Sequence, residues 1–390
     1  MEYIQLSNDE GTPSVEDKWH SLHVNEALAS YTQEYLWRLD EQIQVPEQDS
    51  ILRNVVLILT VTNNDTSLSI RRMKVALNNI IQKHSILRTR LKYNTAEDCL
   101  TQSIKPLRDE DQYYSFQIST IARQEELGNI LRAEQMSRSY FNLEQGIVLR
   151  CHLIRYYLNN NVNDDLLLDG DTILFSFHRS AFDGDSASIF LHDFQLAYMN
   201  ELSDNDDALK YIDYSIYERE ILMTDKKDEA VAYWNSILDE YNIEKQLLLP
   251  FDHSNRDRRT GHSSSVHFEL DDDLVQKMIL CKGQMNVSIF QLALSVYYVY
   301  LFKLTNSQYN DICVGSVIAN RYRPDLKSLI GMFVSVLPFC LKFDPTLSFS
   351  NILKHVQQLS VKISKYSYLP NKQISSLLRP HASILPFPQT

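Results

Sequence analysis

The sequence predicts an α/β protein built from two lobes. Strands and helices alternate along the chain, an acidic polar stretch at 200–208 interrupts them near the middle, and the alternation then resumes. With 390 residues, 44% of them hydrophobic, the chain can bury two cores of ordinary domain size. We therefore expect a loose tail at 1–20, an N-terminal lobe at 21–205 and a C-terminal lobe at 206–390.

The first half of the chain shows the periods typical of strands and helices. Branched apolar residues at 57–62 indicate a strand. A helix follows, because Ser67 or Ser69 can cap it and the next apolar residues fall on one stripe. The apolar run 172–178 predicts another strand, and 186–199 predicts a helix directly after it.

The second half repeats this order after the acidic connection. We expect a helix near 228–238, a strand near 264–270 and a strand near 311–318. Between the two strands, 288–304 is the most apolar helix candidate. It contains tyrosines, a glutamine and a lysine and is too short and mixed to span a bilayer, so we interpret it as a buried helix.

The bulk composition excludes several classes of function. A net charge of −12 disfavours nucleic acid or an anionic membrane as the main partner. The acidic N-terminus lacks the apolar core of a signal peptide, so we expect a cytosolic protein. The five cysteines form no CxxC pair and show no metal-ligand spacing, which predicts reduced, mostly buried thiols and no metal site. They are Cys99, Cys151, Cys281, Cys313 and Cys340.

The most informative motif lies at 172–186. Its alternating apolar run ends on His178 and Arg179, and Asp183 and Gly184 follow after three residues, where a helical pattern begins. On an extended strand His178 shares a face with the serine two residues before it, while the phenylalanines between and before them share the other face.

This segment resembles the HHxxxDG signature of nonribosomal peptide synthetase condensation domains, in the chloramphenicol-acetyltransferase-like superfamily. Arg179 stands at the second histidine of that signature. Further segments resemble other motifs of the family in the same order, and the resemblance runs from about residue 25 to 345. These segments are 30–39, 83–91, 141–150, 211–214 and 315–334.

The resemblance implies two similar lobes that form a V-shaped pseudo-dimer, with the reaction centre at their junction. It implies amide formation between acyl and aminoacyl groups tethered to carrier proteins or adjacent synthetase modules. Partner carriers would deliver the phosphopantetheine, and the chain itself would bind no cofactor. The last motif of the family is not readable before Thr390, so we expect an incomplete C-terminal lobe.

Arg179 bears directly on the expected activity. The family uses the second histidine at the reaction centre, and an imidazole can take up a proton near neutral pH. A guanidinium has no acceptor lone pair, although it can donate hydrogen bonds. Three interpretations follow. The chain has lost the reaction, it forms the bond slowly by aligning the reactants alone, or Arg179 turns away from the reaction centre and is structural. We favour lost or severely reduced activity, and His178 as a positioning residue or a core histidine.

Asp183 and Gly184 are structural residues in the family. The resemblance pairs Asp183 with a buried arginine of the second lobe, which corresponds to Arg321, and gives Gly184 the turn into the helix. Asp183 can alternatively act as a plain helix N-cap. We prefer the ion pair, because a buried carboxylate needs a compensating partner.

The stretch 66–96 is basic and has no acidic residue, in contrast to the acidic chain around it. It is either a docking site for an acidic carrier protein or a solvated helix face. The docking candidates are Arg71, Arg72, Lys74 and Arg88. Two alternatives to the condensation enzyme stay open: a non-catalytic docking or scaffold module of the same fold, or an acyltransferase acting on a free amine or alcohol.

Overall fold

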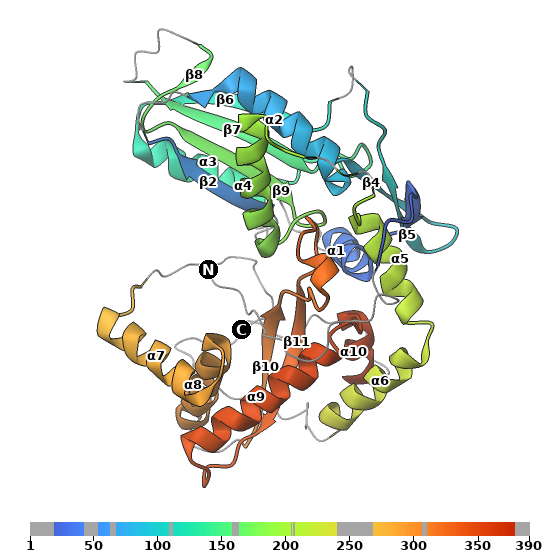
Figure 1. Cartoon of the computed structure of the whole chain (residues 1–390), viewed down its shortest axis with the longest axis vertical. Coiled ribbons are helices and arrows are strands. Elements are labelled where there is room, and N and C mark those ends of the chain that lie inside the picture. Colours follow the sequence, from blue (N-terminus) through green and yellow to red (C-terminus); the bar gives the residue numbers. More distant parts are fainter. Residues whose placement is uncertain are drawn as a thin grey trace.

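The protein folds into two α/β lobes. Most elements before α5 (Tyr211–Ile221) lie in the upper half of Figure 1, and those from α6 (Asp225–Leu238) onward lie in the lower half. The computed structural model describes residues 19–42, 54–62, 68–108, 112–157, 164–203, 205, 207–239, 268–305 and 310–378. Helix α5 runs along the side of the molecule that joins the two halves (Figure 1).

A four-stranded sheet forms the centre of the upper lobe. Its strand order is β2 (Asn54–Thr60), β9 (Thr172–His178), β7 (Leu149–Tyr156) and β6 (Ser115–Ile121). Strand β6 runs parallel to β7, and the other neighbours are antiparallel. The expected strand at 172–178 is therefore confirmed with its bounds.

Helices cover both faces of this sheet. On one side lie α2 (Ile70–Lys83) and α4 (Gly184–Met199), whose apolar stripes pack on Phe175 and Phe177 in the largest hydrophobic core. On the other side lies α3 (Gln124–Met136), which packs on the alternate residues of the same strands. The expected cap of α2 is Ser69, which accepts a hydrogen bond from the third following main-chain N–H.

Smaller elements complete the upper lobe. Helix α1 (Tyr31–Gln42) lies close to α5 and to the lower lobe (Figure 1). The remaining elements are short strands that pair away from the central sheet and one 3-10 turn. They are β1 (Glu26–Leu28), β5 (Cys99–Ile104) and β4 (Thr89–Asn94) in one sheet, β3 (Leu68–Ser69) with β8 (Leu166–Leu167), and η3 (Ser85–Arg88).

The lower lobe is built around one antiparallel strand pair, β10 (Asp311–Ile318) and β11 (Ser335–Lys342). Its core includes Trp234, Tyr298 and Phe339, which come from a helix, a second helix and a strand. The strand expected at 311–318 is confirmed. The other elements are α7 (Asp272–Met285), α8 (Ile289–Leu304), η4 (Pro324–Leu326), α9 (Phe349–Lys365) and α10 (Asn371–Leu378).

Helix α5 packs into the core of the upper lobe although it follows the acidic connection. Its Tyr211 and Tyr214 lie in the same hydrophobic cluster as Phe333, which comes from the segment after η4. The described part of 200–208 has neither helix nor strand beyond the end of α4, as expected of a connection. The domain boundary at 205 stays a prediction.

One sequence-based expectation needs correction, and another falls mostly outside the described residues. Helix α8 is buried on one side only, since Val296 is 53% exposed and Tyr300 is 55% exposed. Because apolar residues lie on all faces of this helix, its sequence does not show which face packs against the strands. The strand expected at 264–270 falls mostly outside the described residues, and 268–270 has no regular structure.

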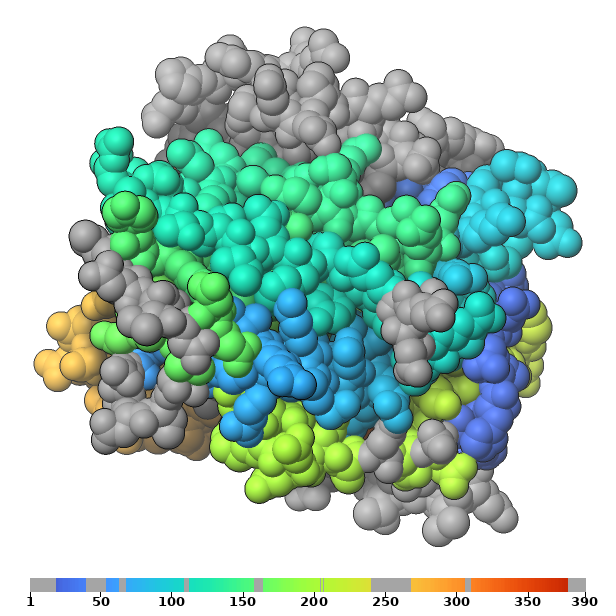
Figure 2. All heavy atoms as spheres, turned by 90° about the horizontal axis from the view of Figure 1, so that it is seen from above, coloured from blue at the N-terminus to red at the C-terminus, as the bar shows by residue number. Residues whose placement is uncertain are grey.

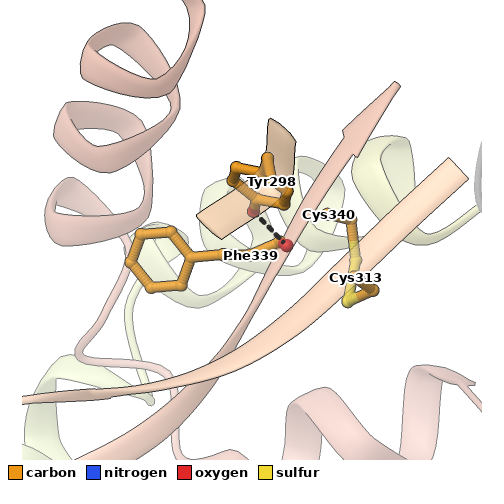
Figure 3. The surroundings of a disulfide bond; sticks show 4 residues. All are labelled: Tyr298, Cys313, Phe339 and Cys340. Carbon is orange, nitrogen blue, oxygen red and sulfur yellow. Dashed lines mark hydrogen bonds between the residues drawn. A yellow bond between two sulfur atoms is a disulfide. The ribbon is translucent and has the colours of Figure 1, made fainter. Parts of the chain in front are cut away.

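The expectation of five reduced thiols is wrong for two of them. Cys313 on β10 and Cys340 on β11 face each other in the strand register and are joined by a disulfide (Figure 3). Beside them the Tyr298 hydroxyl donates a 2.6 Å hydrogen bond to the Phe339 carbonyl. This pairing depends on register, which cysteine spacing does not reveal. The remaining three cysteines are free.

None of the helices in the described ranges is by itself long and apolar enough to cross a membrane. Helices α7 and α8 together meet the criteria of length and composition, but they meet at a bend of 105°.

Candidate functional site

Strand β9 ends on His178, a few residues before Asp183, which pairs with the lower lobe. His178 lies opposite Asn54 of β2 and is half-buried. The imidazole packs edge-on against the Phe141 ring, with 5.7 Å between ring centroids. The expected alternation holds, because Phe177 points into the main core and Ser176 points to the opposite face.

The contacts of Ser180 define the tautomer of His178. The Ser180 main-chain N–H donates to Nδ1 of His178 at 3.2 Å, and Oγ of Ser180 lies 2.8 Å from the same nitrogen. A main-chain N–H can only donate, so Nδ1 must offer its lone pair. The neutral imidazole therefore carries its proton on Nε2 and acts there as a hydrogen-bond donor.

Arg179 is half-buried and lies beside helix α1. Burial raises the pKa of Tyr35 on this helix, and the positive charge of Arg179 partly opposes that rise. Nearby, the Gln33 amide donates to the Ser180 carbonyl at 3.2 Å. Helix α1 therefore forms one wall beside the turn at 178–180.

Asp183 and Arg321 form the expected ion pair across the junction. Nη1 of Arg321 lies 2.7 Å from Oδ2 of Asp183, and Nη2 lies 2.9 Å from Oδ1, so the contact is bidentate. Both side chains are buried, and the guanidinium also stacks on the ring of Phe333 at 4.3 Å. A buried ion pair in which each charge has its partner is tolerated, whereas a single unpaired charge in the same place is strongly destabilising.

Asp183 is also the N-cap of α4, so the two alternatives considered for it occur together. Its Oδ1 accepts from the main-chain N–H of Ser186 at 3.0 Å, and Oδ2 accepts from the N–H of Phe333 at 3.1 Å. Gly184 is the first residue of α4, and its backbone has no positive φ. The turn therefore does not need the conformational freedom of glycine.

A second contact between the lobes joins Tyr211 to the segment after Arg321. A Cβ atom added at Gly331 would overlap the Tyr211 ring, so only glycine allows this close approach. The Tyr211 hydroxyl donates to the Met332 carbonyl at 2.6 Å, and Oγ of Ser186 donates to the Gly331 carbonyl at 3.0 Å. Burial raises the pKa of Tyr211 well above its ordinary value.

The four docking candidates differ in their surroundings. Arg71 is exposed on α2, whereas the guanidinium of Arg72 lies 4.3 Å from the Tyr198 ring centroid. Lys74 lies 4.1 Å from the Phe116 ring centroid. Arg88 donates to the carbonyls of Ile81 and Gln82 and so caps the end of α2. A docking role stays a prediction for all four residues.

Sequence reasoning missed several residues of this site. Ser180 and Phe141 contact His178, Tyr35 on α1 feels the charge of Arg179, and Gln33 on the same helix donates to the Ser180 carbonyl. All four stand in segments that resemble family motifs, and that position was the available signal. In the ranges described, no group of three or more His, Cys, Asp or Glu side chains could hold a metal ion.

The geometry defines a two-lobed α/β protein whose degenerate HHxxxDG segment is fixed at the lobe junction by a buried ion pair. The family model for the condensation domain matches residues 32–384, and the chain therefore belongs to the condensation-domain family.

The chain is similar to parts of several large synthetases. It is 25% identical over 365 residues to a linear gramicidin synthase of Brevibacillus parabrevis, covering 91% of this chain and 7% of that protein. It is 26% identical over 354 residues to phosphinothricin tripeptide synthetase PhsC of Streptomyces viridochromogenes, covering 88% and 30%. The chain thus spans less than a third of either relative.

Solved structures share the fold. The condensation domain of the Monacolin K polyketide synthase MokA aligns with a TM-score of 0.70 at 18% identity, covering 91% of this chain and 76% of that chain. The epimerization domain TycB3(E) of tyrocidine synthetase B aligns with a TM-score of 0.72 at 18% identity, covering 93% and 79%. Identities this low support the fold alone.

Proposed function

We propose that this chain acts in nonribosomal peptide synthesis and aligns two carrier-tethered acyl groups for slow amide formation. The observation that carries the proposal is the buried Asp183–Arg321 pair between the lobes, which follows directly on the segment that carries His178 and Arg179. In this proposal the phosphopantetheine arms belong to partner carriers or adjacent modules.

The bond-forming step requires the amine nitrogen to attack the thioester carbonyl carbon. The C–N bond forms, the C–S bond breaks, and the leaving thiolate takes up the proton that the amine loses. Alignment of the amine and the thioester alone lowers the activation barrier by ~7–11 kcal/mol in favourable cases. His178 and Arg179 contribute donors for the developing oxyanion, from Nε2–H and the guanidinium.

These two residues contribute no proton acceptor to that step. Nδ1 of His178 is engaged by Ser180, and a guanidinium has no lone pair to offer. The reaction therefore depends on an amine that arrives unprotonated. The same observation favours a second candidate, a non-catalytic module that binds loaded carriers and forms no product.

The proposed partners follow from the surface and charge of the chain. Arg71 is an exposed docking candidate on α2, and an acidic carrier would complement its charge. The net charge of −12 disfavours nucleic acid and anionic membranes as partners, so an acidic carrier would dock on the basic stretch 66–96 and not on the chain at large. We extend the proposal to a cytosolic location, where such synthetases meet their carriers.

Single-turnover transfer between two carriers loaded with aminoacyl phosphopantetheine tests the proposal. Product should form slowly and require both loaded carriers and the folded chain. Binding of both carriers with product at the uncatalysed rate would establish the non-catalytic module instead. Failure to bind either carrier would overturn both candidates.

A further inference from the structure

On the α3 side of the upper sheet, away from the lobe junction, hydrogen-bond contacts link a serine to a histidine and the histidine to a glutamate. Oγ of Ser119 on β6 lies 2.8 Å from Nε2 of His152 on β7. Nδ1 of the same imidazole lies 2.7 Å from Oε1 of Glu134 on α3. In the parallel register His152 lies opposite Gln117, and Ser119 stands two residues further along β6, so Ser119 and His152 share one face of the sheet.

Glu134 is an ionised carboxylate at the inner end of this series. Its side chain is fully buried, and Oε2 accepts from the Ser176 hydroxyl at 2.7 Å. Burial opposes the charged form, but hydrogen bonds from His152, Arg150 and Ser176 outweigh it and hold the pKa of Glu134 below its ordinary value. A carboxylate accepts only, so Nδ1 of His152 donates its proton to it.

When the ring of His152 is neutral, the electron pair on Nε2 faces the Ser119 hydroxyl. The Arg150 guanidinium compensates the charge of Glu134 through a 2.9 Å contact to Oε1. With Nδ1 protonated, Nε2 of the neutral ring is an acceptor, and the Ser119 hydroxyl donates to it. This proton arrangement is that of an activated serine, with a base and a group that orients the base.

The serine stands where a small reagent can reach it. His152 is 3% exposed and shielded from water, whereas Ser119 is half-buried on β6, the outermost strand of the described sheet. Residues in the colours of β6 and α3 lie across the middle of the surface seen from above in Figure 2, beside those of α2. The amide of Gln117, on the same strand, donates to Oγ of Ser119 at 3.1 Å and holds the hydroxyl in place.

We propose that Ser119 is a nucleophile, activated by His152 and Glu134, that accepts the acyl group of small activated esters and thioesters. Oγ of Ser119 attacks the carbonyl carbon and forms a C–O bond while the bond to the leaving alkoxide or thiolate breaks. His152 takes the hydroxyl proton at Nε2 and passes it to the leaving group. Water then attacks the acyl-serine, returns its proton through His152 and releases the acid.

The test is covalent labelling of the full chain with a fluorophosphonate, followed by mapping of the adduct by mass spectrometry. The adduct should lie on Ser119, and Ser119→Ala should abolish it. His152→Asn keeps a donor toward Glu134 but removes the base, and a positioned general base contributes ~10²–10⁴-fold. Labelling of this variant should therefore be slower by a factor of about 100 or more.

Ser188→Ala is the matched control, because the hydroxyl of this exposed serine donates to the main-chain carbonyl of Asp185 at 2.9 Å. Its labelling should equal that of the wild type, and p-nitrophenyl acetate hydrolysis should follow the same order among the variants. A folded wild-type chain with no adduct on Ser119 would overturn the proposal, whatever the stability of the variants. Equal labelling of a folded His152→Asn chain would do the same and leave the series a purely structural network.

Discussion

Arg179 is the residue whose chemistry limits the proposed bond formation. It stands where the family resemblance places a histidine, and the neighbouring His178 already uses Nδ1 as an acceptor for Ser180. A guanidinium in this place offers hydrogen bonds and positive charge but takes up no proton. Replacing it with an imidazole therefore changes the kind of catalysis that the site can provide.

We predict that Arg179→His raises the rate of amide formation. The imidazole restores a group that accepts a proton, and a well-placed general base contributes ~10²–10⁴-fold. Single-turnover transfer between two loaded carriers measures this rate for both chains. Wild-type rates at or above those of Arg179→His would show that alignment with an arginine donor is the better mechanism.

Glu218 is a second residue with unusual chemistry, buried on α5 near the lobe junction. Burial raises its pKa to about 7. Its carboxyl group accepts hydrogen bonds from the main-chain N–H of Tyr31 and the hydroxyl of Tyr214, each at 3.0 Å. The folded protein therefore binds a proton here at a pH where the unfolded chain has released it.

This difference predicts a pH-dependent stability. The stabilising effect of the raised pKa is full below the unfolded value and is lost as pH rises through about 7. The side chain in Glu218→Gln carries no charge at either pH. The free energy of unfolding of this variant, relative to that of the wild type, should therefore increase by ~2–3 kcal/mol from pH 5 to pH 8. Urea unfolding at the two pH values measures the gain, and a constant difference would contradict the assignment.

Among the elements, the pair β10 and β11 carries a covalent bond that cysteine spacing did not indicate. The disulfide closes a sequence separation of 27 residues, which includes η4 and the segment that holds Arg321 and Gly331. It limits the unfolded chain in the region that supplies the contacts to the upper lobe. A cross-link of this kind typically stabilises by ~2–4 kcal/mol.

We predict that a reductant lowers the urea midpoint of the wild type by a corresponding amount. Cys313→Ser should show the lower midpoint with and without reductant. Cys281→Ser is the control, because this cysteine is free and its loss should leave the response to reductant intact. A midpoint that does not respond to reductant in the wild type would contradict a stabilising disulfide.

At the scale of single helices and strands, the local sequence pattern predicted much of the fold. Helix α2, strand β9 and strand β10 follow from apolar period and a capping serine, because the information lies within a few residues of sequence. The exposed side of α8 and the Cys313–Cys340 pairing did not follow. Both depend on which distant element packs alongside, and a period cannot encode that.

In the whole molecule, the Asp183–Arg321 pair links the end of the upper sheet to the lower lobe. Its members are 138 residues apart, and both side chains are buried. The site as a whole was less predictable than this pair. Motif position located Asp183 and Arg321, whereas Ser180 beside His178 and the series from Ser119 to Glu134 required strand register and helix packing.

We predict that Asp183→Ala destabilises the fold by ~3 kcal/mol or more, because it leaves the guanidinium of Arg321 buried without its bidentate partner. Denaturant unfolding gives the value. Asp185→Ala is the matched control, since its carboxylate lies farther from the same guanidinium, at 3.7 Å, and is more accessible to water. Equal losses for the two variants would contradict a special role for Asp183.

The several contacts of Asp183 have a consequence for how this protein can change over generations. One carboxylate caps α4, pairs with Arg321 and accepts the N–H of Phe333, so any substitution there disturbs three attachments at once. None of those attachments involves position 179. Random substitution can therefore explore new side chains at position 179 while the architecture persists, and the same scaffold can carry different chemistries.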